Sequence, residues 1–295
     1  MKQFIKYTAI LGAVLSVLGF GTAWAAKING GNWRRDDIGN TLYSFPYSGK
    51  YDPGQEYGGN HVTYVPTSET EYQVNVAKAQ EDNTLCFPAS KTLKLEMEAG
   101  EIIVTAGEVS DIRISCDDPG RMKEFLRIYK DNEDDELEIY VEGTKGKDGL
   151  YPKLNVVVPA NFQFHEVEIG AATGSIQFTG LKTQELEVNI TAGNVTIQEA
   201  VVSDADFKCA SGNISYSGTI QGDADGECAT GNISLSLMQK ESDFNYDLEG
   251  VGGSIQIGDM EFSGLAFERL IKNNALHDME FECVTGSIQV IFNGE

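Results

Sequence analysis

The sequence predicts an all-β chain whose short parallel strands stack as a β-solenoid-like column of coils, each roughly 19 residues long. Three observations predict it. A Gly-[Ser/Asn]-[Ile/Val] motif recurs at a nearly constant spacing, and apolar residues alternate with polar ones on both sides of each motif. The composition, 32 Gly and 7 Pro in 295 residues, also suits many turns between short strands.

The repeated motif begins at a glycine and occurs six times in the second half of the chain. Its glycines are Gly174, Gly193, Gly212, Gly231, Gly253 and Gly286. The first three steps between them are 19 residues each, and the last two are 22 and 33 residues. A period near 20 is typical of a solenoid, in which each coil buries its apolar side only against its neighbours.

Each glycine is expected to form a structural corner. Apolar residues stand five and three positions before it, such as Phe207 and Cys209, and two and four positions after it, such as Ile214 and Tyr216. The inward side therefore changes parity across the glycine, which permits a sharp backbone turn. Each coil then consists of two short strands that meet at the corner and are closed by a loop.

The N-terminus reads as an export segment. Lys2 and Lys6 precede an uncharged run over residues 8–26, and Ala23-Trp24-Ala25 fits a signal-peptidase site. The same run is long enough to span a bilayer if it is not cleaved. We therefore expect residues 1–26 to be a signal peptide or a membrane anchor. In both cases the domain lies outside the cytoplasm, either secreted or held at the membrane by this segment.

The remaining chain divides into a spacer and a repeat domain. Residues 27–90 are rich in Gly and Tyr with weak periodicity, which predicts a flexible spacer. Residues 91–295 form the β-repeat domain, whose first coil begins at 93–104. Residues 124–130 and 136–142 are expected to form a hairpin, and 267–278 a short helix or loop.

A net charge of −23 excludes nucleic acid as an expected partner, because phosphate binding needs a basic surface.

Carboxylates stand six and eight positions before nearly every repeat glycine, on the solvent side. They predict an acidic ladder that keeps the sheet soluble or, alternatively, binds divalent cations or cationic polymers. The weak calcium candidates are Glu168, Glu187, Asp204, Asp206, Asp223 and Asp225. Calcium binding would be weak, since no EF-hand is present.

Two further sets of equivalent positions in the repeat carry polar or reactive groups. Asn194, Asn213 and Asn232 follow successive glycines and are expected to hydrogen-bond along the stack. Cys209 and Cys228 occupy equivalent positions in adjacent coils, close enough for a disulfide. Their inward, apolar setting favours free thiols instead.

No Ser-His-Asp order, HExxH or GxSxG motif appears in the sequence. A carbohydrate-active β-helix enzyme is the catalytic alternative, but it would set basic residues against acidic ones. The regular coils offer chiefly Lys182, Lys208 and Lys240. We expect no enzyme, no catalytic residue and no cofactor.

Several segments together resemble a bacterial family of exported β-strand-repeat proteins, catalogued as domain of unknown function 4097 and labelled "putative adhesin". The carriers are the hydrophobic N-terminus, LKLEMEAGEIIV, VVVPANFQFHEVEI, the repeated G-[SN]-I, FNYDLEGVGGSIQIGD and MEFECVTGSIQVIF. The resemblance covers roughly residues 91–295. It implies a β-solenoid-like domain outside the membrane and supplies no catalytic residues.

The expected function is a structural or adhesive scaffold of the cell envelope that contacts a surface polymer or protein. The alternative is a cation- or ligand-binding or sensing module that uses the acidic side.

Overall fold

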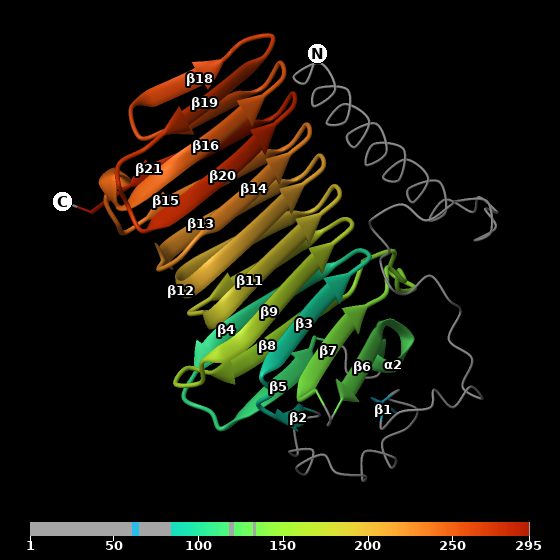
Figure 1. Ribbon diagram of the computed structural model, residues 1–295. Coiled ribbons are helices and arrows are strands. Elements are labelled where there is room, and N and C mark those ends of the chain that lie inside the picture. Colours follow the sequence, from blue (N-terminus) through green and yellow to red (C-terminus); the bar gives the residue numbers. More distant parts are fainter. Residues whose placement is uncertain (1–60, 65–83, 118–120, 132–133, 295) are drawn as a thin grey trace.

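The computed structural model describes residues 61–64, 84–117, 121–131 and 134–294. Within them the chain is all-β, wound into a column with two long strand layers (Figure 1). Helical structure in these residues is limited to α2 (Met122–Phe125) and a 3₁₀ turn, η3 (Glu241–Asp243). Among the described residues no helix is long and apolar enough to cross a membrane. The predicted export segment, residues 1–26, lies outside the described part.

The first sheet holds the strands that run toward the glycine corners. From β7 to β16 all its neighbouring strands are parallel, and antiparallel strands β6, β1 and β19 close its two ends. In spatial order it contains β1 (His61–Tyr64), β6 (Leu126–Asp131), β7 (Glu136–Val141), β3 (Thr92–Met97), β9 (Phe164–Ala171), β11 (Lys182–Ile190), the second half of β12 (Asn194–Cys209), β14 (Ala224–Cys228), β20 (His277–Cys283), β16 (Phe244–Gly250) and β19 (Phe267–Ile271).

The second sheet holds the strands that leave the corners, and the long strand β12 passes from it into the first sheet. It is parallel from β8 to β17, with antiparallel strands at both ends. In spatial order it contains β2 (Leu85–Pro88), β5 (Asp111–Cys116), β8 (Lys153–Pro159), β4 (Glu101–Gly107), β10 (Ser175–Thr179), the first half of β12, β13 (Asn213–Ile220), β15 (Asn232–Leu237), β21 (Ser287–Phe292), β17 (Ser254–Ile257) and β18 (Met260–Ser263).

The coils do not stack in the order of the chain at either end of the column. The last coil, β20–β21, lies between β14–β15 and β16–β17, and Figure 1 shows the red strand β20 between β14 and β16. At the other end, the β3–β4 coil lies between β7–β8 and β9–β10. The antiparallel strands outside these coils cover parallel edges that would otherwise be open to pairing with other chains.

The predicted inward columns form the core, which confirms the β-solenoid-like fold. Phe207, Ile214 and Tyr216 are at most 1% exposed. Gly226 stands where other coils carry a large residue, because its register neighbours in the two adjacent coils are Phe207 and Phe281. The Phe281 ring occupies the space beside this glycine, where a Cβ would lie 2.7 Å from Phe281 Cδ1.

The repeat glycines allow a close approach between coils. A Cβ on Gly212 would lie 1.9 Å from the carbonyl oxygen of Gly193, and one on Gly231 would lie 2.3 Å from that of Gly212. Hydroxyl groups next to these glycines join the coils further: Thr230 Oγ1 donates to the Ala210 carbonyl at 2.9 Å. Only Gly174, among the six, has a left-handed φ, of 96°. The other corners therefore need glycine for space rather than for conformation.

Other expected elements are mostly confirmed. Residues 124–130 and 136–142 contain the antiparallel pair β6 and β7, and residues 93–104 form most of β3 and the start of β4. The expectation of a short helix or loop over 267–278 is wrong in its first half. Residues 267–271 form β19, which pairs with the outer edge of β16 and buries Phe267 against Gly250.

The expected spacer, residues 27–90, lies mostly outside the described part of the chain. Its described pieces are β1 and β2, which pair with β6 and β5 at one end of the column. Leu85 and Phe87 of β2 are buried in the core. The domain boundary at residue 91 stays a prediction.

Candidate functional site

The outward side of the first sheet between β7 and β16, here called the acidic face, gathers carboxylates on neighbouring strands. They are Glu136, Glu138, Glu96, Glu166, Glu168, Glu185, Glu187, Asp204, Asp206, Asp223, Asp225, Glu227, Asp278, Glu280, Glu282, Asp247 and Glu249. Lys94 and Lys208 lie among them. Strand alternation places these side chains opposite the apolar ones, so the acidic ladder faces solvent as predicted.

The outward side of the second sheet between β10 and β17, here called the neutral face, has a different chemistry. Its alternating outward positions are Ser175, Gln177, Thr179, Asn194, Thr196, Gln198, Asn213, Ser215, Ser217, Asn232, Ser234, Ser236, Ser287, Gln289, Ile291, Ser254 and Gln256. None of these positions is charged. Most carry a hydroxyl or an amide, so one face of the column is negatively charged and the other is polar but uncharged.

A row of amides runs along the neutral face and confirms the predicted asparagine stacking. Asn213 Nδ2 donates to Asn194 Oδ1 at 2.7 Å, and Asn232 Nδ2 donates to Asn213 Oδ1 at 2.8 Å. Ser287 Oγ continues the row to Asn232 Oδ1 at 2.6 Å. Asn213 and Asn232 therefore each keep one N–H and one lone pair for solvent or a ligand, and Asn194, which only accepts in this row, keeps both N–H groups.

Repulsion on the acidic face follows from its register. Asp206, Asp225 and Glu280 are direct neighbours on β12, β14 and β20, about 4.8 Å apart by strand spacing. Burial, together with the charges of Asp206 and Glu280, raises the pKa of Asp225. Such carboxylates oppose folding while they are ionised.

Two lysines offset part of this charge. Lys94 Nζ lies 3.0 Å from Glu168 Oε1 and 3.2 Å from Glu136 Oε2, and Lys208 pairs with Asp206 on its own strand. Burial alone would lower the pKa of Lys94, but the hydrogen bond and charge of Glu168, and those of Glu136, raise it well above its usual range. The lysine thus stays protonated and ties β3 to both neighbouring strands.

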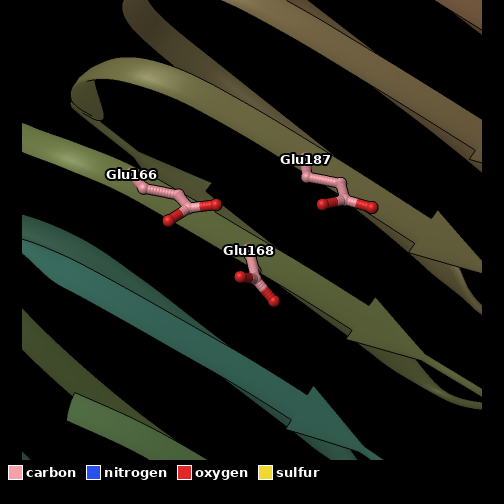
Figure 2. Close-up of side chains that lie close together, drawn as sticks. All are labelled: Glu166, Glu168 and Glu187. Atoms are coloured by element: carbon pink, nitrogen blue, oxygen red, sulfur yellow. The ribbon is translucent and has the colours of Figure 1, made fainter. Parts of the chain in front are cut away.

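Three glutamates converge on one point of the acidic face. Glu166 and Glu168 on β9 and Glu187 on β11 are half-buried, and each has a carboxylate oxygen within 4.8 Å of the other two (Figure 2). Burial, then the charge of Glu168, raises the pKa of Glu166. Two of the six candidate residues, Glu168 and Glu187, thus lie together with a third, Glu166, which the candidate set left out.

The four candidate aspartates lie in other coils, and several carry structural hydrogen bonds. Asp204 Oδ1 accepts from the backbone N–H of Asp223 at 2.9 Å, and Asp223 Oδ1 accepts from that of Asp278 at 2.8 Å. Asp206 is paired with Lys208. The short aspartate side chain reaches the amide at the start of the next strand, so these residues join successive coils.

Asn245 stands at a position of the acidic ladder that is a carboxylate in the other coils, and its amide holds the loop before β20. Its Nδ2 donates to Ala275 O at 3.1 Å and Asp278 Oδ1 at 2.9 Å. Its Oδ1 accepts from the backbone N–H of Asn273 at 3.0 Å. A carboxylate could accept but not donate, and it would face the charge of Asp278.

Asn245→Asp is therefore expected to lower the free energy of unfolding by about 1–3 kcal/mol, because the donor is lost and two carboxylates meet. Thermal unfolding at neutral pH measures the change. Asn194→Asp is the matched control, since Asn194 uses its oxygen as the acceptor for Asn213 and an aspartate keeps that acceptor. Equal losses in the two variants would contradict the role given to the Asn245 amide.

The pH dependence of stability should follow the raised carboxyl pKa values. Burial, then the charges of Glu96 and Glu136, raises the pKa of Glu138 from 4.5 to about 7. A folded-state pKa above the unfolded value means that the folded state holds the proton more tightly, so stability falls as pH rises from about 4.5 to 7. We expect a higher melting temperature at pH 5 than at pH 7.5.

Glu138→Gln should raise the melting temperature at pH 7.5 and reduce this pH dependence, because the neutral amide removes the repulsion. Glu108→Gln, an exposed position outside the acidic face, is the control. A wild-type melting temperature that increases from pH 5 to pH 7.5 would contradict the assignment.

Three buried thiols stack near the corners. Cys209, Cys228 and Cys283 are register neighbours, at most 3% exposed, and carry free thiols, as predicted for the first two. Cys209 Sγ donates to Gly212 O at 3.1 Å and Cys228 Sγ to Gly231 O at 3.0 Å. The neighbouring thiols and burial raise the pKa of Cys228, which keeps it protonated.

Comparisons with known proteins concern the family and the fold. Residues 63–290 match the family described as Toastrack DUF4097. No curated protein matches the chain. One similar solved structure is a putative cell adhesion protein from Clostridium sporogenes ATCC 15579, with 12% identity, 79% of this chain and 98% of that chain covered, and a TM-score of 0.39.

Two other solved structures are similar to this chain. A putative adhesin from Bacteroides fragilis NCTC 9343 is 15% identical over 70% of this chain and 95% of that chain, with a TM-score of 0.35. A putative lipid binding protein from Parabacteroides distasonis ATCC 8503 is 15% identical over 79% of this chain and 98% of that chain, with a TM-score of 0.31.

Proposed function

This chain belongs to the Toastrack DUF4097 family, and from that premise we propose that it is a non-enzymatic protein of the cell envelope. It acts outside the membrane as a structural or adhesive scaffold. Its N-terminal segment, residues 1–26, directs export or anchors the chain.

The observation that carries this proposal is the contrast between the interior and the two faces of the column. The inward positions of both sheets are filled by packed apolar side chains, such as Phe178, Val188 and Leu235, each fully buried. Any binding by the regular coils would then take place on the acidic face, the neutral face or the loops. Long faces built of stacked strands suit contact with extended surfaces more than the enclosure of a small substrate.

The two faces suit different contacts. The neutral face offers hydroxyl and amide groups without a charge to desolvate, so it favours an uncharged polymer or protein surface. The acidic face carries repelling carboxylates that keep the column soluble and oppose sheet-to-sheet association. Contact through one face and solvation through the other would hold an exposed scaffold in a defined orientation.

Localisation and adhesion in the native host test the proposal. We expect the protein in the envelope or extracellular fraction, cleavage by protease added to intact cells, and reduced surface attachment or envelope integrity in cells that lack the gene. Restoring the full chain should restore the phenotype. Recovery in the cytoplasm with protease resistance in intact cells would contradict the extracytoplasmic role.

A second candidate function is cation binding at Glu166, Glu168 and Glu187. Their convergent oxygens favour it, since calcium prefers several carboxylate oxygens. Lys94 already neutralises part of Glu168, so a cation would compete with an internal ion pair. Binding at this position should accordingly be weak.

If the cluster binds calcium, the melting temperature in millimolar calcium should exceed that in sodium at equal ionic strength. A tenfold excess over the dissociation constant corresponds to about 1.4 kcal/mol of added stability. Glu166→Gln should abolish the difference, whereas Asp225→Asn, on a coil away from the cluster, should keep it. Equal melting temperatures for the wild type in the two salts would exclude this second function.

A further inference from the structure

We propose that the C-terminal coil, defined as β20 and β21 over residues 277–292, is exchanged between two copies of this chain. In the exchanged dimer each copy inserts its C-terminal coil between β14–β15 and β16–β17 of the other copy. The inference rests on the topology of the column and does not depend on the proposed function.

The position of the C-terminal coil inside the column is the first argument. β20 pairs in register with β14 on one side and β16 on the other, and β21 pairs likewise with β15 and β17. All four partners precede the coil in the chain. A coil supplied by a second copy would make the same backbone ladders, so exchange needs no new complementary surface.

The side chains of the coil carry the packing energy of this position. Met279, Phe281, Ile288 and Val290 are at most 1% exposed and face the core from between two other coils. In either the closed monomer or the exchanged dimer these side chains would be equally buried. The balance between the two forms therefore depends on the connecting loop and on concentration, not on the core.

The connection to the coil has the features of a hinge. Residues 272–274 and 276 are exposed, with Leu276 at 92%, and Asn274 has a left-handed φ of 57°. The segment 272–276 spans at most roughly 17 Å when extended. A short loop under strain favours exchange, because an extended hinge between two copies relieves it.

Hydrogen bonds from the neighbouring coil control whether the C-terminal coil can leave and re-enter. The hydrogen bonds of Asn245 to Asn273 and Ala275 hold the loop in its closed form. Loss of these bonds should shift the balance toward exchange.

Two differently tagged full-length copies test the proposal. They are unfolded in denaturant, mixed and refolded together over a range of high protein concentrations. We expect a fraction of dimer by light scattering and co-purification of the two tags. Copies mixed after separate folding should not co-purify, because exchange requires the coil to leave the column.

Paired cysteines on the acidic face identify the exchanged element. One full-length copy carries Asp225→Cys as its sole cysteine and the other carries Glu280→Cys, with the native cysteines replaced by alanine. Because these two exposed positions are register neighbours, exchange brings them together across chains, and a short bifunctional thiol reagent should join the copies. The matched control carries Asp206→Cys in one copy and Asp225→Cys in the other; both precede the hinge, so they should not be joined across chains.

Asn245→Ala should raise the dimer fraction several-fold over the wild type, whereas Asn194→Ala, on the neutral face, should not. Circular dichroism confirms that each copy refolds, and the tagged wild-type copies decide the question if a cysteine variant does not. Only monomer after co-refolding at every concentration would overturn the proposal. A dimer in which the control pair at positions 206 and 225 is joined as efficiently as the pair at positions 225 and 280 would also overturn it.

Discussion

Replacing Gly212 with alanine is expected to lower the free energy of unfolding by about 3 kcal/mol, at the upper end of what overpacking usually costs. A Cβ at this corner would lie 1.9 Å from the carbonyl oxygen of Gly193 and 2.9 Å from Cδ1 of Ile190. The Gly193 oxygen also accepts a hydrogen bond from the Asn213 backbone N–H at 3.1 Å. Relief of the clash would therefore separate two coils and weaken a ladder bond.

Urea unfolding followed by circular dichroism measures the loss. Gly170→Ala on β9 is the matched control, because the nearest atoms to its Cβ would all belong to the Glu96 side chain, at ordinary contact distances of 3.5 Å and more. We expect the control to stay within about 0.5 kcal/mol of the wild type, as benign substitutions do. A Gly212→Ala variant as stable as Gly170→Ala would mean that the coils do not approach as closely as the corner requires.

The features that recur in every coil could be predicted from the sequence. Alternation around each glycine identified the inward columns, and the corner itself followed from the change of parity. The repeated asparagine one position after the glycine predicted the amide row, which the hydrogen bonds of Asn194, Asn213 and Asn232 confirm. These features depend on the spacing of residues relative to each glycine, and that spacing is visible in several copies of the repeat.

The order of the coils at the ends of the column could not be predicted in this way. The Gly-Ser-Ile motifs at Gly253 and Gly286 are identical, so the motif alone does not say which coil follows Gly231 in space. Which coil lies next to the Gly231 coil depends on packing between coils, where Gly226 leaves room for Phe281. It also depends on β18 and β19, which pair with β17 and β16 and cover their outer edges.

The negative charge of the acidic face was predictable from the sequence, but the hydrogen-bond and ion-pair partners of its carboxylates were not. The ladder positions identified the carboxylates, yet the backbone hydrogen bonds of Asp204 and Asp223 depend on the register between neighbouring strands. Lys94 reaches Glu168 from a strand more than 70 residues earlier in the chain. Such a partner becomes visible only when the spatial order of the strands is known.

Phe281→Ala should cost about 3–5 kcal/mol of unfolding free energy, as large aromatic deletions in a core do. Phe281 is fully buried, and its register neighbours are Gly226 on β14 and Leu248 on β16. Gly226 has no side chain that could move into the cavity. The surrounding coils are held by ladders on both sides, so the cavity would remain largely open.

The comparison with Phe207→Ala turns this substitution into a test of the coil order. Phe207 lies in the middle of the column between β11 and β14 and is also fully buried. If the C-terminal coil lies inside the column, the two substitutions should destabilise the protein by similar amounts, measured by urea unfolding of the full chain. If the coils instead stacked in chain order, Phe281 would be on the outermost coil with one side uncovered, and its replacement would cost clearly less than that of Phe207. A loss for Phe281→Ala below half of that for Phe207→Ala would contradict the inserted position of the last coil.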